Sequence, residues 1–242
     1  MGNELREILE NSRRIVFFGG AGVSTESGIP DFRSGGGIFH QGTGLRYAPE
    51  ELLSHTFFVR HPADFFAYYR SHLLHPRAEP NAAHRALAWL EQQGRLTAVV
   101  TQNIDGLHQA AGSHTVHELH GSVHRNSCIR CGRRYGLDAI LAGDGVPLCE
   151  CGGMIRPDVV LYEEPLDADV WTAAVAAIRD ADTLVVGGTS LVVYPAAGLV
   201  HEFGGDQLVL INQEPTAFDS LATLVVHEPI AVTLGDAVAG LR

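Results

Sequence analysis

Four cysteines offer a metal site in the middle of the chain. Cys128, Cys131, Cys149 and Cys151 are the only cysteines among 242 residues, and they form the pattern Cys-x2-Cys-x17-Cys-x-Cys. Two close pairs of thiols are typical of structural zinc, which takes four ligands in a tetrahedron. Four thiolates leave no position for a substrate, so we expect one structural, non-catalytic ion. Free thiols and a disulfide are the alternatives, and the clustering favours a reducing compartment.

The second cysteine pair is irregular, because one residue and not two separates Cys149 from Cys151. This pair therefore needs a different backbone path to reach the same ion. Gly152 and Gly153 follow directly and give the chain that freedom, since glycine adopts conformations that other residues avoid.

A glycine-rich turn offers a phosphate site near the start of the chain. The apolar run 14–18 leads directly into residues 19–25, GGAGVST. Such a turn after a strand lets backbone N–H groups approach a pyrophosphate. Thr25 stands where the usual dinucleotide pattern has its third glycine, so a simple strand-to-helix turn stays an alternative.

Two further apolar runs end in small or polar residues. The run 183–186 is followed by GGTS at 187–190, and the run 208–211 is followed by NQE at 212–214. In an open α/β sheet, ligands bind at the carboxyl ends of the strands. Three such ends together predict a nucleotide site.

The elements that must position these residues alternate along the chain. The apolar runs 14–18, 96–100, 183–186 and 208–211 have continuous strand character, and segments 81–93 and 167–181 have helical spacing. Continuous apolar strands between helices are typical of a parallel sheet covered on both faces. We expect an α/β fold, a Rossmann-like doubly wound parallel sheet with a smaller inserted zinc-binding and helical lobe.

Two segments interrupt this alternation and define the expected lobes. An aromatic-rich, helical stretch spans about 33–79, and the cysteine stretch spans about 121–158. We assign both to the small lobe. Residues 1–242 then form one catalytic domain, whose large lobe comprises about 1–32, 80–120 and 159–242.

The charge and composition of the chain limit the classes of partner that we expect it to bind. The net charge of −11 opposes binding to nucleic acid or anionic lipid and suits a basic, lysine-containing protein segment, although it can also serve solubility alone. The charged N-terminal segment has no signal-peptide core, and the uncharged stretch 183–200 contains Gly and Pro that would interrupt a membrane helix. We expect a cytoplasmic protein that binds neither membrane nor nucleic acid directly.

Three long motifs of the chain resemble those of a known protein family. Residues 20–33 (GAGVSTESGIPDFR), 101–108 (TQNIDGLH) and 118–121 (ELHG) resemble motifs of the sirtuins, which are NAD-dependent protein deacylases. The likeness continues through the cysteine segment and residues 157–160 (PDVV) to Asn212, so it covers nearly the whole chain. It is strongest to the bacterial deacetylase branch.

The resemblance implies a protein-lysine deacetylase that consumes NAD as a co-substrate. The acyl oxygen of acetyl-lysine takes the place of nicotinamide on the ribose, and the products are nicotinamide, O-acetyl-ADP-ribose and deacetylated lysine. The implied NAD site consists of Gly20, Ala21, Gly22, Thr25, Asp31, Phe32, Arg33, Gln102, Asn103, Ile104, Asp105, His120, Gly187, Gly188, Thr189, Ser190, Asn212, Gln213 and Glu214.

The implied catalytic residues are His120, Asn103 and Asp105. An imidazole accepts a proton near neutral pH, which suits His120 to act as general base toward a ribose hydroxyl. Asn103 and Asp105 offer an amide and a carboxylate for the nicotinamide and ribose. Taken without the family, the sequence Asn-x-Asp-Gly is also a common turn.

The resemblance also implies how acetylated proteins bind. The implied peptide site consists of Val159, Val160, Leu161, Tyr162 and Val192, and backbone pairing there would tolerate many sequences. Glu163 replaces a commoner glycine and is expected to favour basic residues near the acetyl-lysine.

Four other functions are compared with deacetylation. Relatives that remove succinyl groups carry a Tyr-x-x-Arg pair, and Ala67 and Arg70 align with it. The tyrosine is then missing and deacetylation is favoured, although the adjacent Tyr68 and Tyr69 allow another register. A mono-ADP-ribosyltransferase or a non-catalytic acyl-lysine or ADP-ribose binding module are alternatives. A dehydrogenase is disfavoured, because no hydride-transfer partner follows from the motifs.

Overall fold

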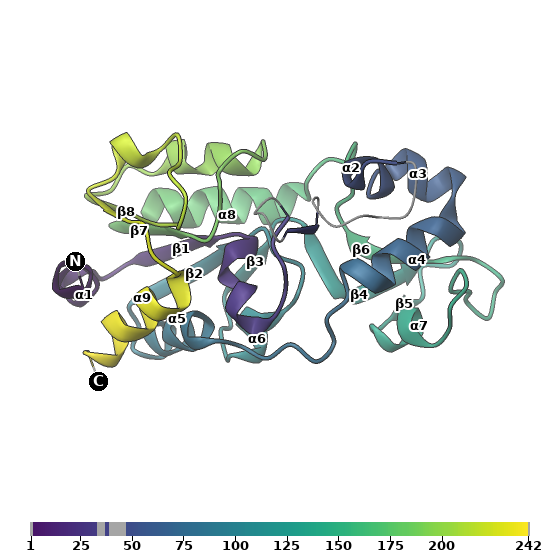
Figure 1. Cartoon of the computed structure of the whole chain (residues 1–242), viewed down its shortest axis with the longest axis horizontal. Coiled ribbons are helices and arrows are strands. Elements are labelled where there is room, and N and C mark those ends of the chain that lie inside the picture. Colours follow the sequence, from purple (N-terminus) through teal and green to yellow (C-terminus); the bar gives the residue numbers. More distant parts are fainter. Residues whose placement is uncertain (1, 33–36, 39–46, 242) are drawn as a thin grey trace.

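The chain forms a large and a small lobe side by side (Figure 1). This computed structural model describes residues 2–32, 37–38 and 47–241. Within them, the large lobe contains a six-stranded sheet with helices on both faces, and the small lobe contains a three-stranded sheet with short helices. This architecture confirms the predicted fold class.

All six strands of the large sheet are parallel and lie in the order β3-β2-β1-β7-β8-β9. They are β1 (Ile15–Gly19), β2 (Leu96–Thr101), β3 (Val116–Glu118), β7 (Thr183–Gly187), β8 (Gln207–Ile211) and β9 (Leu224–Val226). The four predicted strands are the central ones, and every residue of β1 and β7 is buried. Burial on both faces explains their continuous apolar sequence. The two edge strands, β3 and β9, have three residues each and carry little periodic signal.

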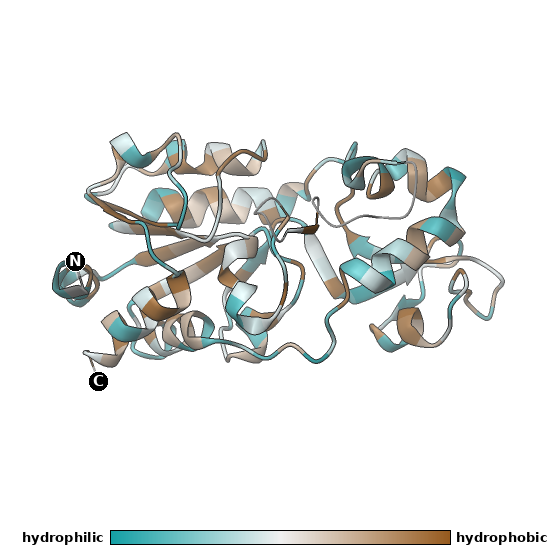
Figure 2. Ribbon diagram, viewed as in Figure 1, coloured by the Kyte–Doolittle hydropathy of each residue, from teal (hydrophilic) through white to brown (hydrophobic). Residues whose placement is uncertain are grey.

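Helices cover both faces of this sheet. On one face lie α1 (Gly2–Asn11), α5 (Ala82–Gln92) and α9 (Ile230–Ala239), and on the other lie α8 (Ala168–Asp180) and η4 (Ala196–Glu202). Asn81 and Asp167 cap α5 and α8 by accepting bonds from the first-turn amides. Figure 2 shows the apolar strands enclosed between these layers. Both predicted helices are therefore confirmed.

The small lobe combines two segments that are distant in sequence. It contains α2 (Pro49–Leu52), α3 (His55–Arg60), α4 (Pro62–His72), β4 (Gly121–Cys128), β5 (Arg134–Tyr135), α7 (Asp138–Leu141) and β6 (Ile155–Val159). Strand β4 lies between β5 and β6 and is antiparallel to both. Phe57 and Phe65 from the helices share one hydrophobic core with Cys149 and Ile155. One packing unit thus supports the helices and the cysteines.

Short elements complete the chain where the lobes meet and where strands connect. They are η1 (Ala21–Val23), η2 (Thr25–Ser27), α6 (Leu107–Ala110) and η5 (Asp219–Leu221). The uncharged stretch 183–200 is β7, a turn and the start of η4. Among the described residues, no helix has both the length and the apolar character needed to cross a membrane.

Candidate active site

A cavity of about 760 Å³ lies at the carboxyl ends of the central strands and extends to the small lobe. It is the place where an open parallel sheet binds ligands. The predicted residues on its wall are Gly20, Ala21, Gly22, Thr25, Asp31, Phe32, Gln102, Asn103, Ile104, Asp105, His120, Val159, Val160, Leu161, Tyr162, Gly188, Thr189, Ser190, Val192, Asn212, Gln213 and Glu214. The fold thus brings together residues from six separate segments.

One predicted cavity residue that the structure describes is not on this wall. Gly187 is the last residue of β7, where an added Cβ would be 2.0 Å from Cδ1 of Ile230, so close packing accounts for this glycine. Arg33 lies outside the described residues.

Two glycine turns, which follow β1 and β7, pack against each other at the cavity. The amide of Gly22 donates to the carbonyl of Gly188 at 2.8 Å, and a Cβ on Gly22 would lie 2.8 Å from Cα of Gly188. Gly188 has a φ of 59°, and its own Cβ would lie 2.4 Å from the amide nitrogen of Val23. Only glycines allow the ends of β1 and β7 to approach this closely.

Ser24, Asn103 and Asp105 form a hydrogen-bonded group on the wall. The Ser24 hydroxyl donates to Oδ2 of Asp105 at 2.7 Å and accepts from Nδ2 of Asn103 at 3.1 Å. Burial raises the pKa of Asp105, while hydrogen bonds from the Leu107 amide and Ser24 oppose that rise. Ser24 was not among the predicted site residues, although it lies between Gly22 and Thr25 in the motif.

His120 is oriented by the backbone. Its Nδ1 donates to the carbonyl of Gln102 at 2.9 Å, because a carbonyl oxygen can only accept, and this leaves Nε2 as the proton acceptor. Burial lowers the pKa of His120, so the ring is neutral at pH 7. Its carbonyl accepts from the Val160 amide at 2.9 Å, which joins the predicted base to the predicted peptide segment.

Strand β4 holds the loop that carries Asn103 and Asp105. The Val123 amide donates to the Ile104 carbonyl at 3.0 Å, and Nε2 of His124 donates to the Asp105 carbonyl at 3.0 Å. The next residue, Gly106, has a φ of 73°, and a Cβ there would lie 2.7 Å from the His124 ring. Loop and strand therefore fit only with glycine at this position.

The predicted peptide segment is docked on the small-lobe helices. Tyr162 exchanges backbone hydrogen bonds with Leu53 and His55, each at 3.0 Å. Glu163 has a φ of 75°, and its carboxylate accepts from the amide and hydroxyl of Thr56 at 2.9 and 2.7 Å. These bonds lower the pKa of Glu163, so its negative charge stays on the cavity wall.

The α4 residues that line the cavity are not the ones that align with relatives that remove succinyl groups. The Arg70 guanidinium donates to the carbonyls of Ile140, Asp144 and Gly145 at 2.5 to 3.0 Å, away from the cavity wall. The wall is formed instead by Tyr69, His72 and Leu73. Among the described wall residues, none is Arg or Lys.

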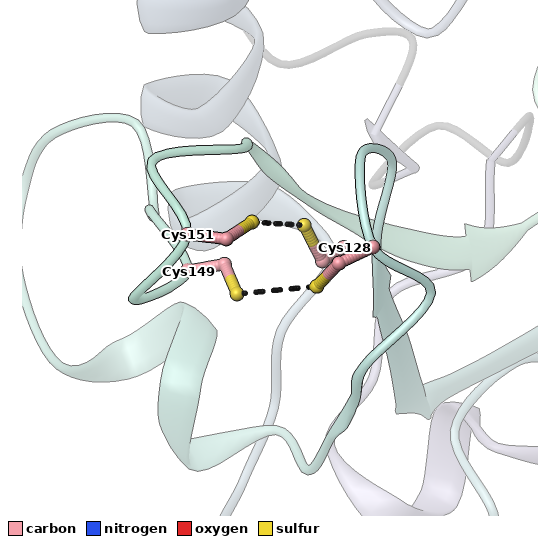
Figure 3. Close-up of side chains that lie close together, drawn as sticks. Cys128, Cys149 and Cys151 are labelled. Carbon is pink, nitrogen blue, oxygen red and sulfur yellow. Dashed lines mark hydrogen bonds between the residues drawn. The ribbon is translucent and has the colours of Figure 1, made fainter.

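The four cysteines converge in the small lobe (Figure 3). Their Sγ atoms all lie within 4.8 Å of one another, with Cys128 to Cys151 at 3.5 Å and Cys131 to Cys149 at 3.6 Å. These separations exclude a disulfide and match the S–S spacing of about 3.8 Å around tetrahedral zinc. A Cβ on Gly153 would lie 2.7 Å from Sγ of Cys128, so a glycine completes the cradle. The donor set fits zinc.

The sheet, the cavity and the thiolate cluster define a class: Rossmann-like proteins with a ligand site at the strand ends and a small structural-metal lobe. The Sir2 family model matches residues 20–195, and the chain belongs to the Sir2 family.

Relatives match along almost the entire chain. An NAD-dependent protein deacetylase of Clostridium perfringens is 58% identical over 96% of both chains, and one of Cutibacterium acnes is 56% identical over 96% of both. A solved complex of Sir2 with a p53 peptide and NAD+ has a TM-score of 0.86 and 38% identity, with 100% of both chains covered.

Proposed function

We propose that this chain is an NAD-dependent protein-lysine deacetylase that releases nicotinamide, O-acetyl-ADP-ribose and the deacetylated lysine. The observation that carries the proposal is 58% identity, over 96% of both chains, to a relative named for this activity. A solved Sir2 complex with a deacetylated p53 peptide and 3′-O-acetyl ADP-ribose, at a TM-score of 0.88 and 39% identity, supports the products.

The cavity residues divide into binding and catalytic roles in this proposal. Gly22 and Gly188 present close backbone for the pyrophosphate, while Thr189 and Asn212 offer polar side chains to the rest of the ADP-ribose. Asn103 and Asp105, held by Ser24, bind the nicotinamide end. Phe32 lies on the wall of the same cavity and would exclude water from it.

Bound NAD would supply a ribose carbon that exchanges nicotinamide for the acyl oxygen of the substrate. The chain contributes the proton acceptor, because Nε2 of neutral His120 is free to take a proton from a ribose hydroxyl. Asp105 lies on the cavity wall, where its carboxylate would favour positive charge that develops at the ribose. The Gln102 carbonyl keeps the imidazole in the tautomer that this step needs.

The cysteines would hold a structural zinc ion that takes no part in the reaction. Cys128, Cys131, Cys149 and Cys151 supply four thiolates, which fill a tetrahedral ion and leave no position for substrate. We assign about 33–79 and 121–158 to the small lobe that this ion stabilises, and about 1–32, 80–120 and 159–242 to the large lobe. We also place the protein in the cytoplasm, where thiols stay reduced.

Acetylated lysines in protein segments would be the substrates, bound between Val160 and Val192. The absence of Arg and Lys from the described wall supports uncharged acyl groups over succinyl or malonyl groups.

The test is to incubate the protein with NAD and peptides carrying acetyl, longer neutral and succinyl groups, and to measure nicotinamide and peptide masses. The 242 residues contain no lysine, so every acyl-lysine in the assay belongs to the added peptide. We expect O-acetyl-ADP-ribose and free lysine from the acetyl peptide. ADP-ribose attached to protein, with the acetyl peptide intact, would instead identify a mono-ADP-ribosyltransferase.

A further inference from the structure

The two cysteine loops give their leading thiolates different backbone partners. In the Cys-x2-Cys loop, Sγ of Cys128 accepts a hydrogen bond from the amide of Arg130 at 3.4 Å. In the shorter Cys-x-Cys loop, and among the described residues, Sγ of Cys149 has no such bond from an amide of its own loop, and its donor is the hydroxyl of Tyr135. The missing residue thus costs Cys149 one amide bond.

A side chain from a different strand occupies that position. The hydroxyl of Tyr135, the last residue of β5, donates to Sγ of Cys149 at 3.0 Å. Cα of Tyr135 is fixed by pairing with Asn126 of β4, the strand that ends at Cys128. The ring packs against the small-lobe core. Strand pairing and packing therefore both aim the hydroxyl at the sulfur.

A second side chain joins the segment that carries Tyr135 to the short cysteine loop. The guanidinium of Arg133, two residues before Tyr135, donates to the carboxylate of Glu150, which lies between Cys149 and Cys151. The hydroxyl of Tyr135 and the side chain of Arg133 therefore both reach the same loop.

We propose that Tyr135 is a positioning residue of the metal site, whose hydroxyl supplies the hydrogen bond that a longer cysteine loop would take from its backbone. A thiolate that binds zinc keeps negative charge, and donors to the sulfur orient it and spread that charge. Loss of such an outer partner typically lowers metal affinity about 10- to 100-fold. The proposal rests on the metal assignment and not on deacetylation.

The test compares the zinc-loaded wild type with Tyr135→Phe, which removes only the hydroxyl. Zinc affinity is measured by competition with a chromogenic chelator, and the rate of zinc release is followed in the same assay. We expect about 10- to 100-fold weaker binding and faster release. Substitution by Co²⁺ adds a readout independent of activity, because its absorption bands report whether four thiolates still bind in a tetrahedron.

A matched control variant distinguishes the loss of the bond from Tyr135 to Cys149 from the general effect of removing a tyrosine hydroxyl from this lobe. Tyr68 is buried in the same core, and its hydroxyl has no hydrogen-bond partner among the described residues. Tyr68→Phe should keep wild-type zinc affinity. An equal loss in Tyr68→Phe and Tyr135→Phe would overturn the proposal.

A second variant tests directly whether the Tyr135 hydroxyl replaces a backbone donor that the short cysteine loop lacks. Insertion of one glycine after Glu150 restores two residues between Cys149 and Cys151 and gives the loop an amide equivalent to that of Arg130 in the longer loop. Tyr135→Phe should then cost clearly less affinity in the lengthened protein than in the wild-type background. Zinc affinity and release within about twofold of wild type for Tyr135→Phe alone would overturn the proposal, and so would an undiminished loss in the lengthened loop.

Discussion

Two buried histidines should lower the free energy of unfolding as the pH falls below about 6.5. His84 of α5 and His108 of α6 are 0% and 1% exposed, and their ring centroids are 4.7 Å apart. Burial lowers the pKa of His84 to about 4, with the charge of Arg85 as a second cause. Burial also lowers the pKa of His108 well below its usual value, with His84 as the second cause.

The sign of the effect follows from the neutral folded form. Below about pH 6.5 the unfolded chain takes up a proton on each histidine while the folded chain does not, so stability present above that pH is lost as the pH falls. At about pH 5.5 an unfolded histidine is about tenfold more often protonated than neutral, which is worth about 1.4 kcal/mol. The pair therefore costs about 2.8 kcal/mol there relative to about pH 7.5.

The assay is urea unfolding of the zinc-loaded protein at these two pH values. His84→Gln keeps an acceptor for the Asn81 amide in the capping box, and His108→Leu replaces a ring whose nitrogens have no partner among the described residues. Each variant should lose about 1.4 kcal/mol less than the wild type between the two pH values, and the double variant about 2.8 kcal/mol less. A double variant with the wild-type pH dependence would refute this reasoning.

Further predictions concern the cavity. His120→Ala should lower kcat for deacetylation by about 10²- to 10⁴-fold, because Nε2 is the proton acceptor, while NAD binding measured by calorimetry and the zinc content stay near wild type. Ser24→Ala removes a bond to the Asp105 carboxylate and should lower kcat/KM about 10- to 150-fold; unchanged kinetics would contradict the hydrogen-bonded group. Gly106→Ala should raise KM for NAD, because its Cβ meets the His124 ring. Gly94→Ala, at a similar φ of 69° with nothing within 4 Å, is the control that should leave KM unchanged. Glu163→Gln should lower any preference for basic residues beside acetyl-lysine by about 1.4- to 5-fold in kcat/KM across a peptide array, and an unaltered preference would remove that role.

Local patterns in the sequence predict much of the fold. The continuous apolar runs predict the central strands, because strands buried on both faces have no polar face to alternate. Asn81 and Asp167 mark the starts of two helices through their capping chemistry. The small and polar residues that follow the runs predict the position of the cavity, because parallel strands bring their carboxyl ends to one edge.

Contacts between distant residues set the limits of that prediction. Ser24 carries no signal of its own, and its role depends on Asp105, which lies 81 positions further along the chain. The sequence also did not predict which residues of α4 line the cavity, because the adjacent Tyr68 and Tyr69 allow two alignments with the Tyr-x-x-Arg pair of the relatives. In the structure, Tyr69 and His72 line the cavity. Arg70 instead donates to backbone carbonyls of the segment 140–145.

The sequence by itself determined the fold class, the strand ends that form the cavity and the four thiols that suit zinc. These features depend on residue type and short-range spacing, which periodicity and known ligand chemistry reveal. Only the tertiary structure decided how Ser24 joins Asp105, how β4 holds the neighbouring loop, and how Tyr135 reaches Cys149. Those contacts depend on strand pairing and side-chain packing between segments that the sequence separates.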